Sequence, residues 1–509
     1  MMSLPFLPVL IPLIGGVLVL LARQAGLNLQ RSISFLWVLA LLVVSIELLY
    51  SASQSSSPLV YTLGNWIAPY GIVLVLDQLS ALMIFITAIL ALGALWYAIS
   101  TRMDEQGPHF HVLFQIQLFG LNGAFMTGDV FNLFVFFEVL LLASYGLMLH
   151  GGGRLRTKAG LQYVVINLIG STLFLFAVGT LYGVLGTLNI ADMANKIALL
   201  SSEDQGVVAA AGLLLLLVFG IKAAMFPLYL WLPQAYANAA APVAALFAIM
   251  TKVGLYAIIR VHGTLFGEHA QALAFFYTPW LLGLGLVTLI LAALGVMAAR
   301  GLREQVAYLV LASVATLLVG IGLNTPAALS ATLYYLIHST LVAGGFFLLA
   351  DIIARGKGSL EDCFKSGPAM PQAILIGSTF IFAAIAMVGM PPLSGFFGKV
   401  LILSSALNHD YFGWILTIVL ISSLIMIIAM ARSGSVLFYH IQPNTESTGE
   451  PLNKLAYLAV LWLFSTSVVL VVFADPITSM TDTIAQQLFN SNHYIDSVLN
   501  TPAVGKVSL

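Results

Sequence analysis

Five ionisable side chains lie within long apolar segments of the sequence. They are one glutamate, three lysines and one histidine: Glu138, Lys222, Lys252, His338 and Lys399. A charged side chain at the centre of a bilayer costs about 2.5–3.5 kcal/mol on insertion scales. Each of these residues is therefore expected to have a polar partner or a functional role. Carboxylate, ammonium and imidazole groups bind protons reversibly, and burial and neighbouring charges set how readily they do so. These residue types therefore indicate proton movement through an apolar interior.

Glu138 and Lys222 are the first two of these groups along the chain. Glu138 lies about nine residues after Asp129, where a helix is expected to begin, hence ~13 Å into the bilayer at 1.5 Å per residue. A protonated carboxylic acid bonded to a neighbouring helix is the alternative. Lys222 precedes Pro227 by five residues, so capping of the carbonyls that the proline releases is the alternative for its ammonium. We favour a pair that changes protonation near neutral pH.

Lys252, His338 and Lys399 continue the pattern in later apolar segments. For Lys399 the alternative is a lysine that snorkels to the interface, because the end of its segment is poorly defined. For His338 the alternative is a hydrogen-bonded core histidine, since a single membrane histidine is weak evidence of function. We predict that all five groups form one proton pathway, in which His338 bridges between lysines.

The composition excludes a water-soluble globular protein. Of 509 residues, 60% are hydrophobic and 8% are charged, whereas an ordinary soluble domain has about 25% charged residues. The apolar content is enough for roughly fourteen spans of ~20 residues each. The formal net charge is −1, and the sequence has no basic tract that would bind nucleic acid.

The sequence contains no pattern for a cofactor, a metal ion or soluble-enzyme chemistry. The single cysteine, Cys363, cannot form an internal disulfide, and no Cys/His cluster has the spacing of a zinc, iron–sulfur or haem site. No phosphate-binding loop or nucleophile elbow occurs either. We therefore expect a transporter rather than an enzyme, without a cofactor of its own, and any redox chemistry must belong to a partner.

Hydrophobic runs predict an all-α polytopic membrane protein with about fourteen transmembrane helices. Two runs, 206–233 and 373–407, are too long for one straight crossing. Pro227 in the first run, and Pro391 and Pro392 in the second, predict broken helices at the seventh and twelfth positions. The predicted spans are 3–22, 33–50, 77–100, 110–126, 130–149, 161–185, 206–233, 241–261, 273–299, 305–323, 327–351, 373–407, 411–438 and 453–474.

Lysines and arginines divide unevenly between the two sides of the predicted bundle. Thirteen fall on one side, and only Lys196, Arg260 and Lys506 fall on the other. The positive-inside rule therefore places both termini outside. Between the second and third spans, the alternating stretches Leu59–Thr62 and Ile72–Val75 predict a small extracytoplasmic hairpin.

Two segments that lie five spans apart repeat one pattern, a lysine and a proline break within a long apolar run. They are 222–233 and 389–399. An odd offset gives the two copies opposite orientation, as in the inverted-topology repeats of secondary transporters, whose sites lie where helices are interrupted. The pattern is compatible with an inverted repeat.

Three stretches of the sequence resemble a known superfamily. They are Thr127–Val139, 222–233 and Ala241–Tyr256, which surround the first three ionisable groups. They are similar to the antiporter-like subunits shared by Mrp-type cation/proton antiporters and respiratory complex I. The resemblance covers nearly the whole chain, and the length and the Asp129–Glu138 segment are most similar to the Mrp-type subunits.

The resemblance implies fourteen helices with two inverted five-helix repeats, spans 4–8 and 9–13, around a central hydrated polar axis. The implied organisation is 1–106 for helices 1–3 with the hairpin, 107–262 for the first repeat, 263–440 for the second repeat, and 441–509 for helix 14 and the C-terminal tail.

The resemblance also assigns family roles position by position. The span-five glutamate, its paired lysine, the central lysine, the span-eleven histidine and the distal lysine correspond to Glu138, Lys222, Lys252, His338 and Lys399. Many relatives have a lysine four residues after that histidine, where this chain has Val342. A relay between the central and distal lysines then rests on the histidine, on hydroxyls such as Thr340, and on water.

The resemblance implies a secondary-transporter subunit that exchanges H+ for Na+ or another monovalent cation. Such a subunit works with other membrane subunits in the lipid bilayer of a bacterial inner membrane. The alternative is a proton-pumping membrane subunit of a complex I-like or hydrogenase-type redox complex, which needs iron–sulfur and flavin partners. The same five residues would serve both functions, so the partners distinguish them.

Overall fold

A computed structural model describes residues 4–441 and 449–501 of the chain. Within these ranges, twelve helices are long and apolar enough to cross a bilayer, so the predicted polytopic helical membrane protein is confirmed. The other two predicted spans are a helix of 17 residues, Phe110–Met126, and the run 373–407, which is divided between helices of 16 and 12 residues. Lys506, which entered the charge count, lies outside the described residues.

The N-terminal half contains three long helices followed by a longer series. The first three helices are α1 (Leu7–Leu21), α2 (Leu27–Gln54) and α3 (Gln78–Ser100). The series comprises α4 (Phe110–Met126), α5 (Val130–Met148), α6 (Arg154–Leu185), α7 (Ile190–Ala198), α8 (Gln205–Ala223), α9 (Trp231–Asn238), α10 (Ala241–Phe247), α11 (Met250–Ala257) and α12 (Gly263–Leu265). A π-helical turn, Ile258–His262, joins α11 to α12.

The C-terminal half has a second series and three final helices. The second series comprises α13 (Thr278–Ala298), α14 (Leu302–Gly322), α15 (Pro326–Gly356), α16 (Ala373–Val388), α17 (Ser394–Ser405) and α18 (Phe412–Phe438). The final helices are α19 (Lys454–Val472), α20 (Ala474–Phe489) and α21 (Asn492–Leu499). The described part of the predicted tail is therefore mainly helical. Helix α20 packs along α15, and the hydroxyl of Thr481 on α20 lies 2.9 Å from that of Ser330 on α15.

Two short strands precede α3 and lie at one end of the bundle. Strands β1 (Leu59–Thr62) and β2 (Val73–Leu76) pair antiparallel. The carbonyl of Val73 in β2 also accepts a hydrogen bond from the amide of Gly128 at 2.9 Å, just before α5. The side chain of Asp77 caps the first turn of α3. The sheet thus connects the N-terminal helices to the start of α5.

Two helices are interrupted in mid-course. Helix α8 gives way to α9 across Ala224–Leu230, which contains Pro227, and α16 gives way to α17 across Gly389–Leu393, which contains Pro391 and Pro392. The first residue of each connection has a left-handed φ, 58° and 81° respectively. Because proline has no amide hydrogen, neither connection can continue the helical hydrogen-bond ladder. Both interruptions leave backbone carbonyls inside the protein.

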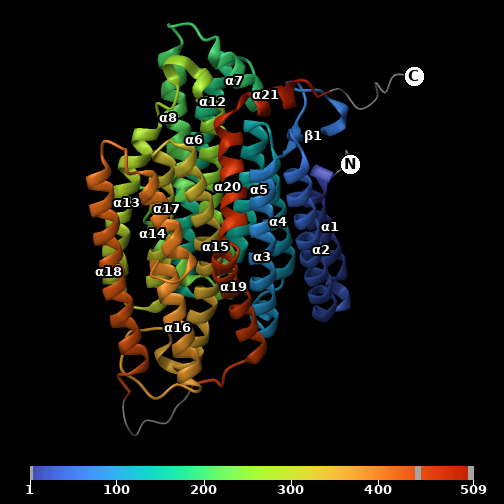
Figure 1. The fold of residues 1–509 in the computed structure, drawn as a ribbon. Helices are drawn as coiled ribbons and strands as arrows, with labels where there is room; N and C mark the ends of the chain where they lie inside the picture. The colour runs from blue at the N-terminus through green and yellow to red at the C-terminus, as the bar shows by residue number, and fades with distance from the viewer. Residues whose placement is uncertain (1–3, 442–448, 502–509) are drawn as a thin grey trace.

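The most deeply buried helices form the centre of the bundle (Figure 1). In the described residues, 94% of the most apolar windows of α14 and α15 are buried, and the window of the α10–α12 span is buried completely. Helices α1 and α2 lie at one edge and α18 lies at the opposite edge, while α19 and α20 run beside α15 (Figure 1). Helices α7 and α21 share one end of the bundle with β1 (Figure 1).

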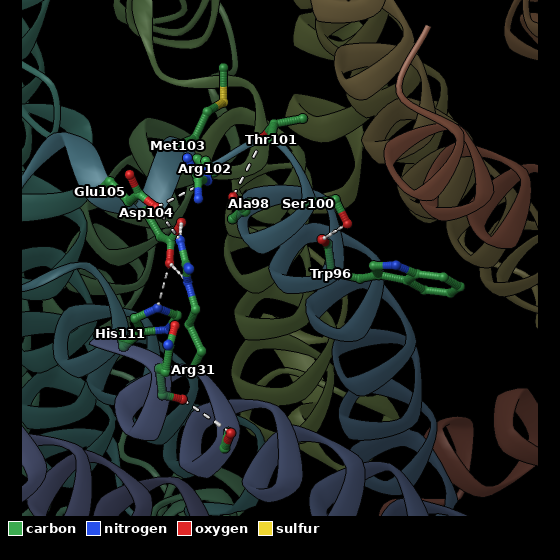
Figure 2. A network of polar contacts seen from close by, with 12 residues as sticks. Arg31, Trp96, Ala98, Ser100, Thr101, Arg102, Met103, Asp104, Glu105 and His111 are labelled. Carbon is green, nitrogen blue, oxygen red and sulfur yellow. Dashed lines mark hydrogen bonds and ion pairs between the residues drawn. The ribbon is translucent and has the colours of Figure 1, made fainter. Parts of the chain in front are cut away.

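An ionic network ties α2 to the connection between α3 and α4 (Figure 2). The guanidinium of Arg31 donates to both carboxylate oxygens of Asp104, at 2.6 and 2.8 Å, and to Glu105 at 2.8 Å. Nε2 of His111 lies 3.0 Å from the same aspartate. Burial raises the pKa of the Asp104 carboxyl, but the hydrogen bonds of Arg31 and His111 outweigh burial and lower this pKa to about 2. The network therefore holds a charged carboxylate at physiological pH.

Candidate functional site

Lys222 lies at the end of α8, directly before the first helix break, and only 8% of the residue is exposed. Its Nζ donates to Oδ1 of Asn167 on α6 at 3.2 Å and lies 5.9 Å from the ring centre of Phe137 on α5. The Nδ2 group of Asn167 donates to the carbonyl of Tyr163 at 2.8 Å. This second bond orients the amide so that its oxygen faces the ammonium. The ammonium of Lys222 thus has a neutral side-chain acceptor.

Glu138 lies on α5 and accepts a hydrogen bond from the hydroxyl of Ser171 on α6. Ser171 and Asn167 are four residues apart, so both point from the same face of α6. The structure therefore brings Glu138 and Lys222 to one helix face but gives each its own neutral partner. Glu138 is half-buried within this chain, because α5 packs on α4 and α6 and leaves another side uncovered.

Lys252 lies on α11 and is fully buried, with an exposed fraction of 0%. Among the described residues, its Nζ has no hydrogen-bond partner, and the same is true of the Thr251 hydroxyl and of the Gln117 amide oxygen on α4. The Gln117 amide nitrogen lies 2.8 Å from the sulfur of Met250. Buried polar groups normally have a partner, and ordered water is one means of satisfying them. This part of the bundle therefore has polar groups suited to bind water.

Gly254 allows the backbone of α11 to contact the backbone of α8 beside Lys222. A Cβ atom on Gly254 would lie 2.6 Å from the amide nitrogen of Ala223 and 2.8 Å from the carbonyl oxygen of Phe219. It would also lie 3.0 Å from the carbonyl carbon of Lys222. Any side chain here would push the helices apart. The glycine thus allows α11, the helix that carries Lys252, to pack directly against the first break.

His338 lies on α15, with 1% of the residue exposed, and faces the second helix break. Its Nδ1 lies 2.7 Å from the hydroxyl of Ser394 at the start of α17, and its Nε2 lies 3.0 Å from the carbonyl oxygen of Ala386 near the end of α16. The Ser394 hydroxyl in turn lies 2.8 Å from that of Ser467 on α19. Both ring nitrogens have partners, as the alternative of a hydrogen-bonded core histidine expects, and those partners flank the break.

Lys399 lies on α17 and also faces the second break. Its Nζ donates to the carbonyl of Val388, the last residue of α16, at 2.7 Å and to the hydroxyl of Ser423 on α18 at 3.0 Å. Only 7% of the residue is exposed. The snorkelling alternative for Lys399 is therefore wrong, because its ammonium bonds to backbone and side-chain oxygens inside the bundle.

The Thr340 hydroxyl, proposed as part of a relay between Lys252 and Lys399, makes no hydrogen bond to either lysine. The Thr340 hydroxyl donates to the carbonyl of Leu336 in its own helix at 2.7 Å, and Val342 is fully buried. The five predicted residues thus occupy two regions. The first-break cluster contains Glu138 and Lys222 with Asn167 and Ser171, and Lys252 lies on the adjacent helix. The second-break cluster contains His338 and Lys399 with Ser394 and Ser423.

Four hydrogen-bonding residues of these clusters, Asn167, Ser171, Ser394 and Ser423, were not predicted. Small uncharged polar residues are common within membrane helices, where they often bond to the backbone or a neighbouring helix. Only their position beside a charged group distinguishes them, and that position depends on helix packing. In the described ranges 4–441 and 449–501, no group of three or more His, Cys, Asp and Glu residues could hold a metal ion.

Interrupted helices that hold lysines inside an apolar bundle are typical of membrane proteins that transport ions. A family model described as "NADH:quinone oxidoreductase/Mrp antiporter, TM" matches residues 127–426, which include all five predicted pathway residues. The chain belongs to this family.

Relatives cover nearly the whole chain. The D subunit of the probable K+/H+ antiporter of Rhizobium meliloti is 38% identical, and the match covers 98% of each chain. The D subunit of the Na+/H+ antiporter of Alkalihalophilus pseudofirmus is 36% identical, over 98% of this chain and 100% of the relative. A chain in the solved structure of the Mrp complex from Dietzia sp. DQ12-45-1b is 26% identical, with a TM-score of 0.84 over 98% of this chain and 99% of that one.

Proposed function

We propose that this chain is a proton-translocating, D-type subunit of a multisubunit monovalent cation/proton antiporter in a bacterial inner membrane. The relatives at 36–38% identity are antiporter subunits of this type. The observation that carries the proposal is the first-break cluster. There, the carboxylate of Glu138 and the ammonium of Lys222 approach one face of α6, and each is held by a neutral side chain. Such groups can exchange partners when one of them gains or loses a proton.

The proposed pathway runs from Glu138 through Lys222, Lys252 and His338 to Lys399. Lys252 supports continuity because its helix touches α8 and because its buried ammonium has no hydrogen-bond partner within residues 4–441 and 449–501, so water can solvate it. Each charge that crosses 100 mV gains or loses ~2.3 kcal/mol, equivalent to ~1.7 pH units. The membrane potential is therefore large enough to drive changes in protonation along the pathway. The partners are other membrane subunits, and the exchanged ion is Na+ or another monovalent cation.

Fourteen spans with two inverted five-helix repeats, 107–262 and 263–440, complete the proposal. The two breaks support it. The sequences MFPL (225–228) and MPPL (390–393) follow a left-handed residue in each case. In both, the methionine amide donates to the carbonyl five residues earlier, at 2.8 Å in the first break and 2.9 Å in the second. Helices 1–3 with the hairpin (1–106) and helix 14 with the tail (441–509) flank the repeats, with both termini outside.

The experiment that tests the proposal replaces the first-break charges in the complete complex. Glu138→Gln and Lys222→Ala are expected to abolish cation-dependent proton exchange in everted membrane vesicles while the complex still assembles. Glu47→Gln and Lys158→Ala are matched controls, because both residues are exposed. Wild-type exchange by an assembled Glu138→Gln or Lys222→Ala complex would refute the proposed role.

The partners are tested on the same material. A complex purified gently from native membranes should contain several membrane proteins and show no flavin or iron–sulfur absorbance. Flavin or iron–sulfur absorbance with hydrophilic partners would instead assign the pathway to a complex I-like or hydrogenase-type redox pump.

A further inference from the structure

Helix α6 contributes two buried, uncharged side chains to the first-break cluster, Asn167 and Ser171. Their exposed fractions are 1% and 7%. Asn167 accepts from the ammonium of Lys222, and Ser171 donates to the carboxylate of Glu138. Neither residue changes its charge in the physiological pH range. Helix α6 therefore supplies a fixed neutral partner to each member of a pair whose own charges change.

The amide of Asn167 is held rigidly. Its Nδ2 donates to the carbonyl of Tyr163 one turn earlier at 2.8 Å, and the Tyr163 hydroxyl lies 2.8 Å from that of Ser144 on α5. The oxygen of Asn167 is consequently fixed toward Lys222 at 3.2 Å. An ammonium bonds more strongly to a carboxylate than to an amide. Contact with the amide is therefore the alternative to a direct ion pair with Glu138.

We propose that Asn167 is a positioning residue that holds the ammonium of Lys222 apart from the carboxylate of Glu138. Lys222 then has two alternative acceptors of unequal strength, the amide of Asn167 and the carboxylate of Glu138. The protonation state of Glu138 selects between them. An ionised Glu138 attracts Lys222 away from the amide, and a protonated Glu138 returns it. This inference rests on the proposed function, because it supplies the contact that lets the pair open and close.

The groups around Lys222 make the pH dependence testable. Glu138 on α5 is the charged group that acts on Lys222, while the phenols Tyr145 on α5 and Tyr163 on α6 lie at the edge of the cluster. Phe137 contributes only its ring. Without the amide acceptor, Lys222 should stay beside Glu138. An ammonium held against a carboxylate gives up its proton less readily, so transport should require a higher pH.

The test compares Asn167→Leu with Asn122→Leu in the complete complex. Leucine has nearly the shape of asparagine but accepts no hydrogen bond. Asn122 is a matched control because it is fully buried on α4 and donates to the carbonyl of Pro8 at 2.7 Å, outside the cluster. Antiport is measured in everted vesicles between about pH 6 and 10 and normalised to assembled complex.

For Asn167→Leu we expect antiport near neutral pH to fall about tenfold and the active range to move up by about one pH unit. Asn122→Leu should keep the wild-type pH profile, and Asn167→Ser, which retains a hydroxyl acceptor, should restore part of it. A profile for Asn167→Leu that matches the wild type, or one reduced by the same factor at every pH, would overturn the inference. Wild-type antiport by Glu138→Gln would instead refute the proposed function, so the two failures are distinguishable.

Discussion

The contact between α8 and α11 makes Gly254→Ala a sharp test of how closely these two helices must pack. The added Cβ atom would lie 2.6 Å from a backbone nitrogen and 2.8 Å from a backbone oxygen of α8. Backbone atoms cannot rotate out of the way as the end of a side chain can. The only relief is for α11 to move away from α8, and Lys252 moves with it.

The size of the movement follows from the distances. Non-bonded heavy atoms are most favourable at about 3.5–4.0 Å, so contacts of 2.6 and 2.8 Å require the two helices to separate by about 1 Å. Overpacking of this kind typically costs about 1–3 kcal/mol, which a large helical bundle can tolerate without unfolding. A misplacement of about 1 Å can lower a reaction that depends on position by up to ~100-fold. We therefore expect antiport to fall by about 10- to 100-fold.

The assay is cation-dependent proton exchange in everted vesicles, with the amount of assembled complex measured on native gels. Gly263→Ala is the control, because Gly263 belongs to the same span and an added Cβ there would meet nothing within 4 Å. It should keep wild-type exchange. If the Gly254→Ala complex assembles and exchanges protons at the wild-type rate, close packing of α11 on α8 beside the first break is not required.

Two further predictions concern stability and orientation. The pKa of Asp104 is lowered from 3.8 to about 2, so its network stabilises the fold above pH 3.8 and loses this contribution as the pH falls toward 2. The difference in melting temperature between the wild-type complex and Asp104→Asn should therefore shrink over that range, and a constant difference would contradict the assignment. Cys363 is exposed in the loop between α15 and α16, on the side of the bundle where the sequence places most lysines and arginines, so a membrane-impermeant maleimide should label it in everted vesicles. Labelling in right-side-out vesicles instead would reverse the proposed orientation.

The sequence could predict the helix breaks and the charged residues because both carry a large local cost. A lysine such as Lys222 in an apolar run demands a partner, and a proline such as Pro227 interrupts the helical ladder wherever the chain is placed. These signals depend on neighbours in sequence. They identified two regions that the structure also shows as interrupted helices, before any information on packing.

The contacts of those residues were less predictable because they depend on which helix faces which. The half-burial of Glu138 reflects the open side of α5, and the partnership between Asn167 and Lys222 reflects the packing of α6 on α8. The inward position of Lys399 depends on α18, which supplies Ser423. A periodic pattern assigns residues to faces of one helix but does not pair those faces.

The two breaks hold their lysines differently. The difference lies in which groups bond to the carbonyls that each interruption frees from the helical ladder. In the first break, the indole of Trp231 donates to a carbonyl of the last turn of α8 at 3.1 Å, and the Lys222 ammonium bonds to a side chain. In the second break, His338 and Lys399 themselves contact carbonyl oxygens of the last turn of α16, at 3.0 and 2.7 Å. Moving Lys399 would leave a buried carbonyl unsatisfied, at about 1–3 kcal/mol, whereas Lys222 can change partners without that loss. We therefore expect the first break to respond first when a proton enters, and the second to follow only when charge arrives to displace its lysine.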